Sequence, residues 1–275
     1  MYGSIRINIS DHNTLFHLII RSSGHLPKQT LGRSFLNKTS GRITFRTALE
    51  GYLRVKRLTI LTLMLATIRY ELDQHYSFDF VEGNVDFPLA SGTSLTINTI
   101  FSFYDSSDQY FAYFSPTSHE SVESALANLS KFLDLEGPYD GVLAFSHGAS
   151  FISTYIIQQL LAHPTAPLPF KCAVFFSATS PIDPRVLDMH QEVKALRGSE
   201  NDLRLINIPT AHIWDTDDSV SLGASQELWN LCEDDKRWRF LHGEGHEIPN
   251  SRDREAVFEI TKVIRRAVEM GLSAG

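Results

Sequence analysis

From about Tyr76 to the end of the chain, two patterns of hydrophobic and polar positions follow each other in turn. Short apolar runs rich in β-branched and aromatic residues are separated by longer stretches in which apolar residues recur every three or four positions. The first pattern predicts buried strands and the second predicts helices. The predicted strands are Ser77–Val81, Gly141–Phe145, Ala173–Ser177, Ala211–Trp214 and Trp238–Leu241.

Three helical segments lie between or after these strands. They are His119–Leu135, whose apolar side chains fall on one face, the strongly apolar Ser150–Leu161, and the amphipathic Ser251–Met270. Strands that alternate with helices in one continuous pattern are typical of a parallel sheet covered by helices. We therefore predict a single α/β domain with a doubly wound, mostly parallel sheet.

The first 75 residues do not join this pattern, and their role stays open. Met1–Leu31 is polar apart from the run Leu15–Ile20, so we assign 1–33 to a poorly matched N-terminal extension and 34–275 to the α/β domain. The apolar run Leu58–Ile68 has about half the length needed to cross a bilayer, and Leu15–Ile20 is shorter than the apolar region of a secretory signal. We expect a cytoplasmic protein without a membrane span.

Composition and charge narrow the function further. A 275-residue chain that is 43% hydrophobic can fill a core. The net charge is −7 and the 25 basic residues are scattered, so no nucleic-acid partner is expected. Cys172 and Cys232 lack the spacing of a zinc site or a disulfide framework. Neither GxGxxG nor a P-loop occurs, which argues against a dehydrogenase or a kinase.

One serine lies where a nucleophile is expected. The predicted strand Gly141–Phe145 leads directly into Ser146-His-Gly148, and a helix follows. A nucleophile elbow needs this strand-to-helix turn with small residues two positions before and after the serine. Position 148 is Gly, and position 144 is Ala where Gly is commoner. Ser22, Ser221 and Ser273 also precede a Gly by two positions, but they lack this strand-and-helix context.

The alternative is that Ser146 merely caps the helix. If it is a nucleophile, the backbone N–H of His147 points to where an oxyanion would develop. For the His147 imidazole we favour a polar pocket lining over a part in the chemistry.

A serine hydroxyl needs a base to remove its proton and a carboxylate to orient that base. In an α/β-hydrolase the chain order is Ser, acid, His. His246 lies in a glycine-bearing loop between the last strand and the last helix, where such a fold delivers its base. His242 ends the strand, and a packing or structural hydrogen-bonding role is expected for it.

The acid is expected in the loop after the preceding strand. That loop contains Asp215, Asp217 and Asp218, and its spacing from the strand end favours Asp218. Asp215 and Asp217 are interpreted as solvated turn residues. The pattern thus predicts a serine hydrolase that works through an acyl-enzyme, with Ser146, Asp218 and His246 and with no cofactor or metal.

As an ordered set, these segments resemble the fungal FSH-type serine hydrolases, and most closely the LovG-like thioesterases found beside polyketide synthases. The similar segments are 78–83, 110–114, 136–148, 172–176, 208–212 with Asp218, and 242–249. The resemblance implies an α/β-hydrolase fold and the triad Ser146, Asp218 and His246. It also implies a small ester or a carrier-bound acyl thioester as substrate, with a polyketide synthase carrier domain as a possible partner.

The chain departs from this family upstream. Such proteins have a first strand that ends in Leu-His-Gly-x-Gly-Thr, whose loop supplies a second oxyanion N–H. The nearest match here is Phe35–Gly41, which has no His-Gly pair, and 48–65 looks like an insertion. An alternative function is therefore a catalytically impaired, hydrolase-fold binding protein.

Overall fold

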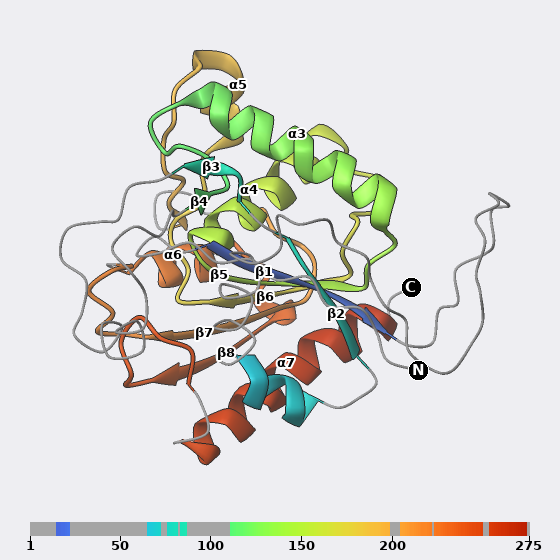
Figure 1. Cartoon of the computed structure of the whole chain (residues 1–275), viewed down its shortest axis with the longest axis vertical. Helices are drawn as coiled ribbons and strands as arrows, with labels where there is room; N and C mark the ends of the chain where they lie inside the picture. Colours follow the sequence, from blue (N-terminus) through green and yellow to red (C-terminus); the bar gives the residue numbers. More distant parts are fainter. Residues whose placement is uncertain are drawn as a thin grey trace, which may run out of the picture.

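The computed structural model describes residues 15–22, 65–72, 76–81, 83–86, 111–198, 204–221, 223–249 and 253–273. Within them a six-stranded sheet forms the centre of the molecule (Figure 1). Its order is β2 (Tyr76–Phe80), β1 (Leu15–Ser22), β5 (Gly141–Ser146), β6 (Cys172–Phe176), β7 (Thr210–Asp215) and β8 (Arg237–His242). All five predicted strands are present, each within one residue of its predicted ends.

The four strands from β5 to β8 run parallel, and β1 lies antiparallel between β2 and β5. The strands β5, β6 and β7 are buried along their whole lengths. This burial explains why β5 and β6 read as continuous apolar runs rather than as alternating ones. A separate two-stranded sheet pairs β3 (Val85–Asp86) with β4 (Phe111–Ala112).

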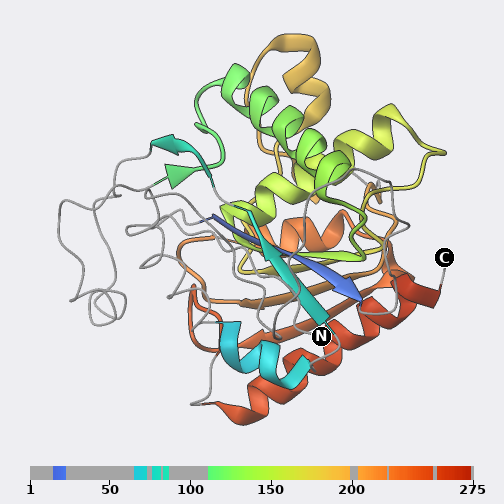
Figure 2. The same ribbon diagram turned by 45° about the vertical axis from the view of Figure 1, so that its right-hand side comes forward.

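Helices cover both faces of the sheet (Figure 2). The helices include α3 (His119–Glu136), α4 (His147–Ala162), α5 (Pro184–His190), α6 (Ala224–Asn230), the short 3₁₀ helix η2 (Asp234–Lys236) and α7 (Arg254–Ser273), and residues 65–72 are also helical. Side chains of α3 and α4 form one apolar core with one face of the sheet. Side chains of α7 form a second core with the opposite face. The predicted doubly wound, mostly parallel α/β architecture is confirmed.

Two helix starts differ from their predicted positions. The helix predicted from Ser150 begins three residues earlier, because the chain turns directly from β5 into α4 at Ser146. The last helix begins at Arg254 rather than at Ser251. Among the helices that the structure describes, none combines the length and hydrophobicity needed to cross a membrane.

The strand β1 comes from the segment predicted as an N-terminal extension. Its residue Leu15 pairs with Ser146 and Ile20 pairs with Gly141. Because β1 runs antiparallel to β5, the first residue of β1 lies beside Ser146. The last residue of β1 lies at the opposite end of the strands, beyond Gly141 (Figure 1).

The predicted insertion at 48–65 meets the described structure only at its last residue. Leu65 begins a helical stretch at 65–72, and it is fully buried with Ile68 in the core that α7 forms with the sheet. Residues 48–64 lie outside the described residues, as does the predicted oxyanion-loop match at 35–41. The insertion thus stays a prediction for 48–64, and Leu65 belongs to the core.

Both cysteines are buried free thiols. Burial, together with the nearby Asp140 carboxylate, raises the pKa of Cys172 to about 12 against the opposing effect of Lys171. The Cys172 thiol is therefore a neutral core group.

His212 on β7 gives the fold a measurable pH dependence. Its ring is buried among Phe175, Trp214 and Trp229, and Nε2 lies 3.0 Å from Thr210 Oγ1. Burial, together with the positive charge of Arg237, lowers the pKa of His212 to about 3. In the unfolded chain its pKa returns to about 6.5, so between these two values only the unfolded state takes up the proton.

The His212 contribution to stability is therefore complete above pH 6.5 and falls as the pH drops toward 3. From pH 7 to pH 5 this group alone should lower the free energy of unfolding by about 2 kcal/mol. Urea unfolding of the wild-type protein and His212→Gln at both pH values measures the effect. The variant should lose about 2 kcal/mol less than the wild type, and an equal loss in both would contradict the prediction.

Candidate active site

Ser146 is the last residue of β5 and directly precedes α4. Its backbone has φ 54° and ψ −124°, a conformation that is rare for residues other than glycine. Such strain is what a sharp strand-to-helix elbow requires, and buried Ala144 and Gly148 flank the turn. The Ser146 side chain makes no capping hydrogen bond to α4. The structure therefore gives no support to the capping alternative.

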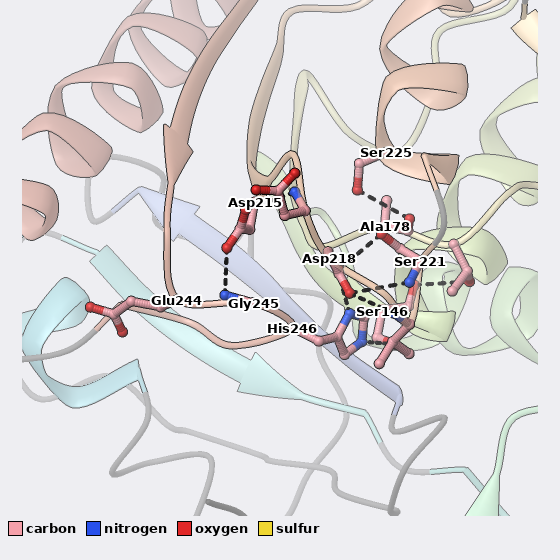
Figure 3. Close-up of polar contacts among 12 residues, drawn as sticks. Ser146, Ala178, Asp215, Asp218, Ser221, Ser225, Glu244, Gly245 and His246 are labelled. Carbon is pink, nitrogen blue, oxygen red and sulfur yellow. Dashed lines mark hydrogen bonds and ion pairs between the residues drawn. The ribbon is translucent and has the colours of Figure 1, made fainter. Parts of the chain in front are cut away.

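His246 comes from the loop that follows β8, and it meets Ser146 above the end of β5 (Figure 3). Its Nε2 lies 2.8 Å from Ser146 Oγ, which is hydrogen-bonding distance for a base and a hydroxyl. The imidazole also packs against Phe145, with the ring centres 5.1 Å apart. A side chain of β5 thus contacts the His246 ring.

Asp218 lies on the other side of the same imidazole. Its Oδ2 is 2.6 Å from His246 Nδ1 and also accepts a hydrogen bond from Ser221 Oγ at 2.9 Å. Its Oδ1 accepts the backbone N–H groups of Val220 and Ser221. Burial acts to raise the pKa of Asp218, but hydrogen bonds and the His246 charge outweigh it and lower the pKa below its usual value. The carboxylate is held ionised next to the imidazole.

The structure thus brings the three predicted residues Ser146, Asp218 and His246 together in one hydrogen-bonded row. His242 accepts the backbone N–H of Glu244 at its Nδ1, 3.2 Å away. This is the structural hydrogen bond expected for that residue.

The interpretation of the acidic loop was correct for one aspartate and wrong for another. Asp217 is exposed, as a solvated turn residue should be. Asp215 is not solvated: it is only 7% exposed, and both of its carboxylate oxygens accept backbone N–H groups. The sequence does not reveal this, because one partner of Asp215 is Gly245 in a different loop.

His147 is the first residue of α4, so its backbone N–H has no partner within the helix. Its ring packs on Phe114, with the centres 4.2 Å apart, and burial lowers the pKa of His147 to about 4. Its Nδ1 is buried and meets no partner within the described part of the chain. The imidazole is therefore neutral at neutral pH.

Sequence reasoning missed two residues that support the site. Ser221 donates its hydroxyl to Asp218, and a serine three positions after an aspartate is a local signal that could have found it. Thr179, after β6, approaches the Ser146 carbonyl oxygen with its N–H and its hydroxyl, each at 3.3 Å. Thr179 is 33 residues away in sequence, and no local pattern reveals it.

Within the described ranges, no group of three or more His, Cys, Asp or Glu residues is placed to hold a metal ion.

The positions of these residues in the fold define a class of protein. A serine on the elbow after a central strand, an aspartate after β7 and a histidine after β8 occur in the chain order Ser, Asp, His. This is the arrangement of the α/β-hydrolase fold, and the fold prediction is confirmed.

Comparison with known proteins gives the family. Residues 48–257 match the family described as serine hydrolase (FSH1), and the chain belongs to this family. It is 32% identical over 211 residues to "Esterase FPY3" of Fusarium mangiferae, covering 76% of this chain and 90% of that protein. The predicted enzyme class, a serine esterase, is confirmed by this membership.

Other relatives match over shorter stretches. "Hydrolase FUB4" of Gibberella moniliformis is 27% identical over 133 residues, covering 48% of this chain and 46% of that protein. Among solved structures, a carboxylesterase from Mesorhizobium loti superposes with a TM-score of 0.44 at 14% identity, covering 73% of this chain and 81% of that one.

Proposed function

We propose that the chain hydrolyses an ester or thioester through an acyl-enzyme formed on Ser146. The observation that carries the proposal is the row of two short contacts, 2.8 Å from Ser146 Oγ to His246 Nε2 and 2.6 Å from His246 Nδ1 to Asp218 Oδ2. In this row, Asp218 fixes the tautomer of His246 in which Nδ1 carries the proton. The lone pair of Nε2 then faces the serine hydroxyl.

The reaction proceeds in two halves. Ser146 Oγ attacks the carbonyl carbon while Nε2 of His246 takes the hydroxyl proton, and the carbonyl oxygen becomes an oxyanion near the His147 N–H. The bond to the leaving group then breaks, and His246 gives the proton to the departing alcohol or thiol. Water next attacks the acyl-enzyme with His246 again as base, which releases the acid and restores Ser146.

The substrate class follows from the family resemblance. The resemblance favours a small ester or a carrier-bound acyl thioester of fungal secondary metabolism as substrate. We further propose a polyketide synthase carrier domain as partner and a cytoplasmic location. The similarity to an esterase of Fusarium mangiferae fits a small ester. These assignments are parts of the proposal.

Stopped-flow hydrolysis of matched p-nitrophenyl esters and N-acetylcysteamine thioesters tests the proposal. Because the acyl-enzyme forms before water attacks, we expect a burst of leaving group equal to the concentration of active enzyme wherever deacylation is the slower step. A faster thioester series at equal acyl length would favour the carrier-bound substrate. Hydrolysis of neither series would contradict the proposed function.

One observation favours the second candidate, an impaired binding protein. The strand β5 lies between β6 and β1, and the antiparallel direction of β1 carries the C-terminal end of β1 away from Ser146. In the family pattern the second oxyanion N–H comes from the loop after a first strand, and the C-terminal end of β1 does not lie beside Ser146. This candidate predicts ligand binding with neither a burst nor steady-state hydrolysis in the same experiment.

Asp218 should matter far more than its neighbour in the acidic loop. Asp218→Asn removes the charge that orients and stabilises the His246 imidazolium, so we expect kcat for p-nitrophenyl butyrate to fall about 10⁴-fold. Asp217→Asn, which changes an exposed side chain, should retain nearly full activity. If Asp215→Asn proved more damaging than Asp218→Asn, the acid would be wrongly assigned.

A further inference from the structure

Asp215 joins the two loops that deliver the acid and the base. It ends β7 and pairs in register with His242, which ends the neighbouring strand β8. Its Oδ1 accepts the N–H of Asp217 at 2.8 Å, in the loop that leads to Asp218. Its Oδ2 accepts the N–H of Gly245 at 2.6 Å, one residue before His246. Figure 3 shows this second contact crossing from one loop to the other.

The loop that carries His246 has open space around its two glycines. Gly245 has φ 67°, the left-handed conformation that favours glycine. A Cβ placed on Gly243 or Gly245 would meet no atom within 4 Å, so side-chain packing does not fix the backbone there. Two backbone N–H groups of this stretch are bound by side chains outside it: Asp215 accepts from Gly245, and His242 accepts from Glu244.

The strength of the Asp215 contact follows from its chemistry and burial. Hydrogen bonds from N–H groups to an ionised carboxylate are shorter and about twice as strong as neutral ones. Asp215 is buried, and removing its carboxylate would leave the N–H groups of Asp217 and Gly245 without this acceptor. Both contacts of Asp215 are with backbone N–H groups, whereas Asp218 contacts the His246 imidazole itself. This difference separates the role of Asp215 from that of Asp218.

We propose that Asp215 is a positioning residue that sets the place of His246 between Ser146 and Asp218 by binding the two loops together. The inference rests on the proposed function of these three residues. Misplacement of a reacting group by about 1 Å can cost about 100-fold in rate. Losing the tether lets the His246 loop shift relative to the elbow, so the chemical step slows while the binding of a small ester does not change.

The test compares Asp215→Ala with the matched control Asp217→Ala from the same loop. Two readouts are used: kcat and KM for p-nitrophenyl butyrate per folded molecule, and the downfield proton NMR resonance of His246 Nδ1–H. For Asp215→Ala we expect kcat to fall about 10- to 100-fold with KM little changed, and the resonance to broaden or vanish. Asp217→Ala should match the wild type in both readouts.

Asp215→Asn keeps one carbonyl oxygen as an acceptor, so its kcat should lie between the alanine variant and the wild type. If Asp215→Ala does not fold, Asp215→Asn tests the positioning role by the same two readouts. Wild-type kcat and an unchanged resonance in a folded Asp215 variant, even one with a lower Tm, would overturn the inference. A wild-type protein without esterase activity, whose resonance is lost only in Asp215 variants, would instead overturn the proposed function and leave the positioning role supported.

Discussion

Replacing Ser146 with alanine should abolish ester hydrolysis and leave the fold intact. The Oγ atom is the only one lost, and it lies 2.8 Å from the base without capping α4. In serine hydrolases that act through such a row, losing the nucleophile costs on the order of 10⁶-fold in kcat. Steady-state hydrolysis of p-nitrophenyl butyrate measures the loss, and thermal unfolding checks that Tm is preserved.

Ser153→Ala is the matched control for this variant. Ser153 is also a buried serine, and it lies on α4, but its hydroxyl donates to the helix carbonyl oxygens of Ala149 and Ser150. Its replacement should leave kcat close to the wild-type value. More than a few per cent of wild-type activity in Ser146→Ala would exclude Ser146 as the nucleophile.

Replacing His246 with alanine should cost nearly as much, on the order of 10⁶-fold in kcat. Without the imidazole, the Ser146 hydroxyl has no base at 2.8 Å, and Asp218 Oδ2 keeps only Ser221 Oγ of its two side-chain partners. Because the two residues act as a unit, the double variant with Ser146→Ala should be hardly slower than either single variant.

His242→Ala distinguishes this account from its closest alternative. His242 holds the Glu244 N–H and lies four residues before His246, so its loss should reduce kcat far less. Greater damage from His242→Ala than from His246→Ala would contradict the assignment of the base.

The sequence predicts the central strands β5, β6 and β7 well, because the helices and neighbouring strands bury them completely. The run from Gly141 to Phe145 is apolar at each position for this reason. The elbow at Ser146 is predictable because its requirements are local: a strand, a serine flanked by small residues, and a helix. His246 and Asp218 follow from their places after successive strands.

Features that depend on distant partners escape the sequence. Leu15–Ser22 gives an apolar run, but nothing in it shows that it pairs antiparallel with β5 next to Ser146. Asp215 is indistinguishable from a turn residue until the β8 loop brings Gly245 to it. Leu65 is at the end of a segment that looks inserted, yet packing against α7 makes it core.

The most direct test of the central claim is to react the protein with a fluorophosphonate and map the modified residue by peptide mass spectrometry. An activated serine attacks phosphorus readily, whereas an ordinary buried hydroxyl does not. The account predicts one adduct per chain, on Ser146, formed rapidly in the wild type and absent in Ser146→Ala. No adduct, or an adduct on another residue that persists in Ser146→Ala, would contradict it.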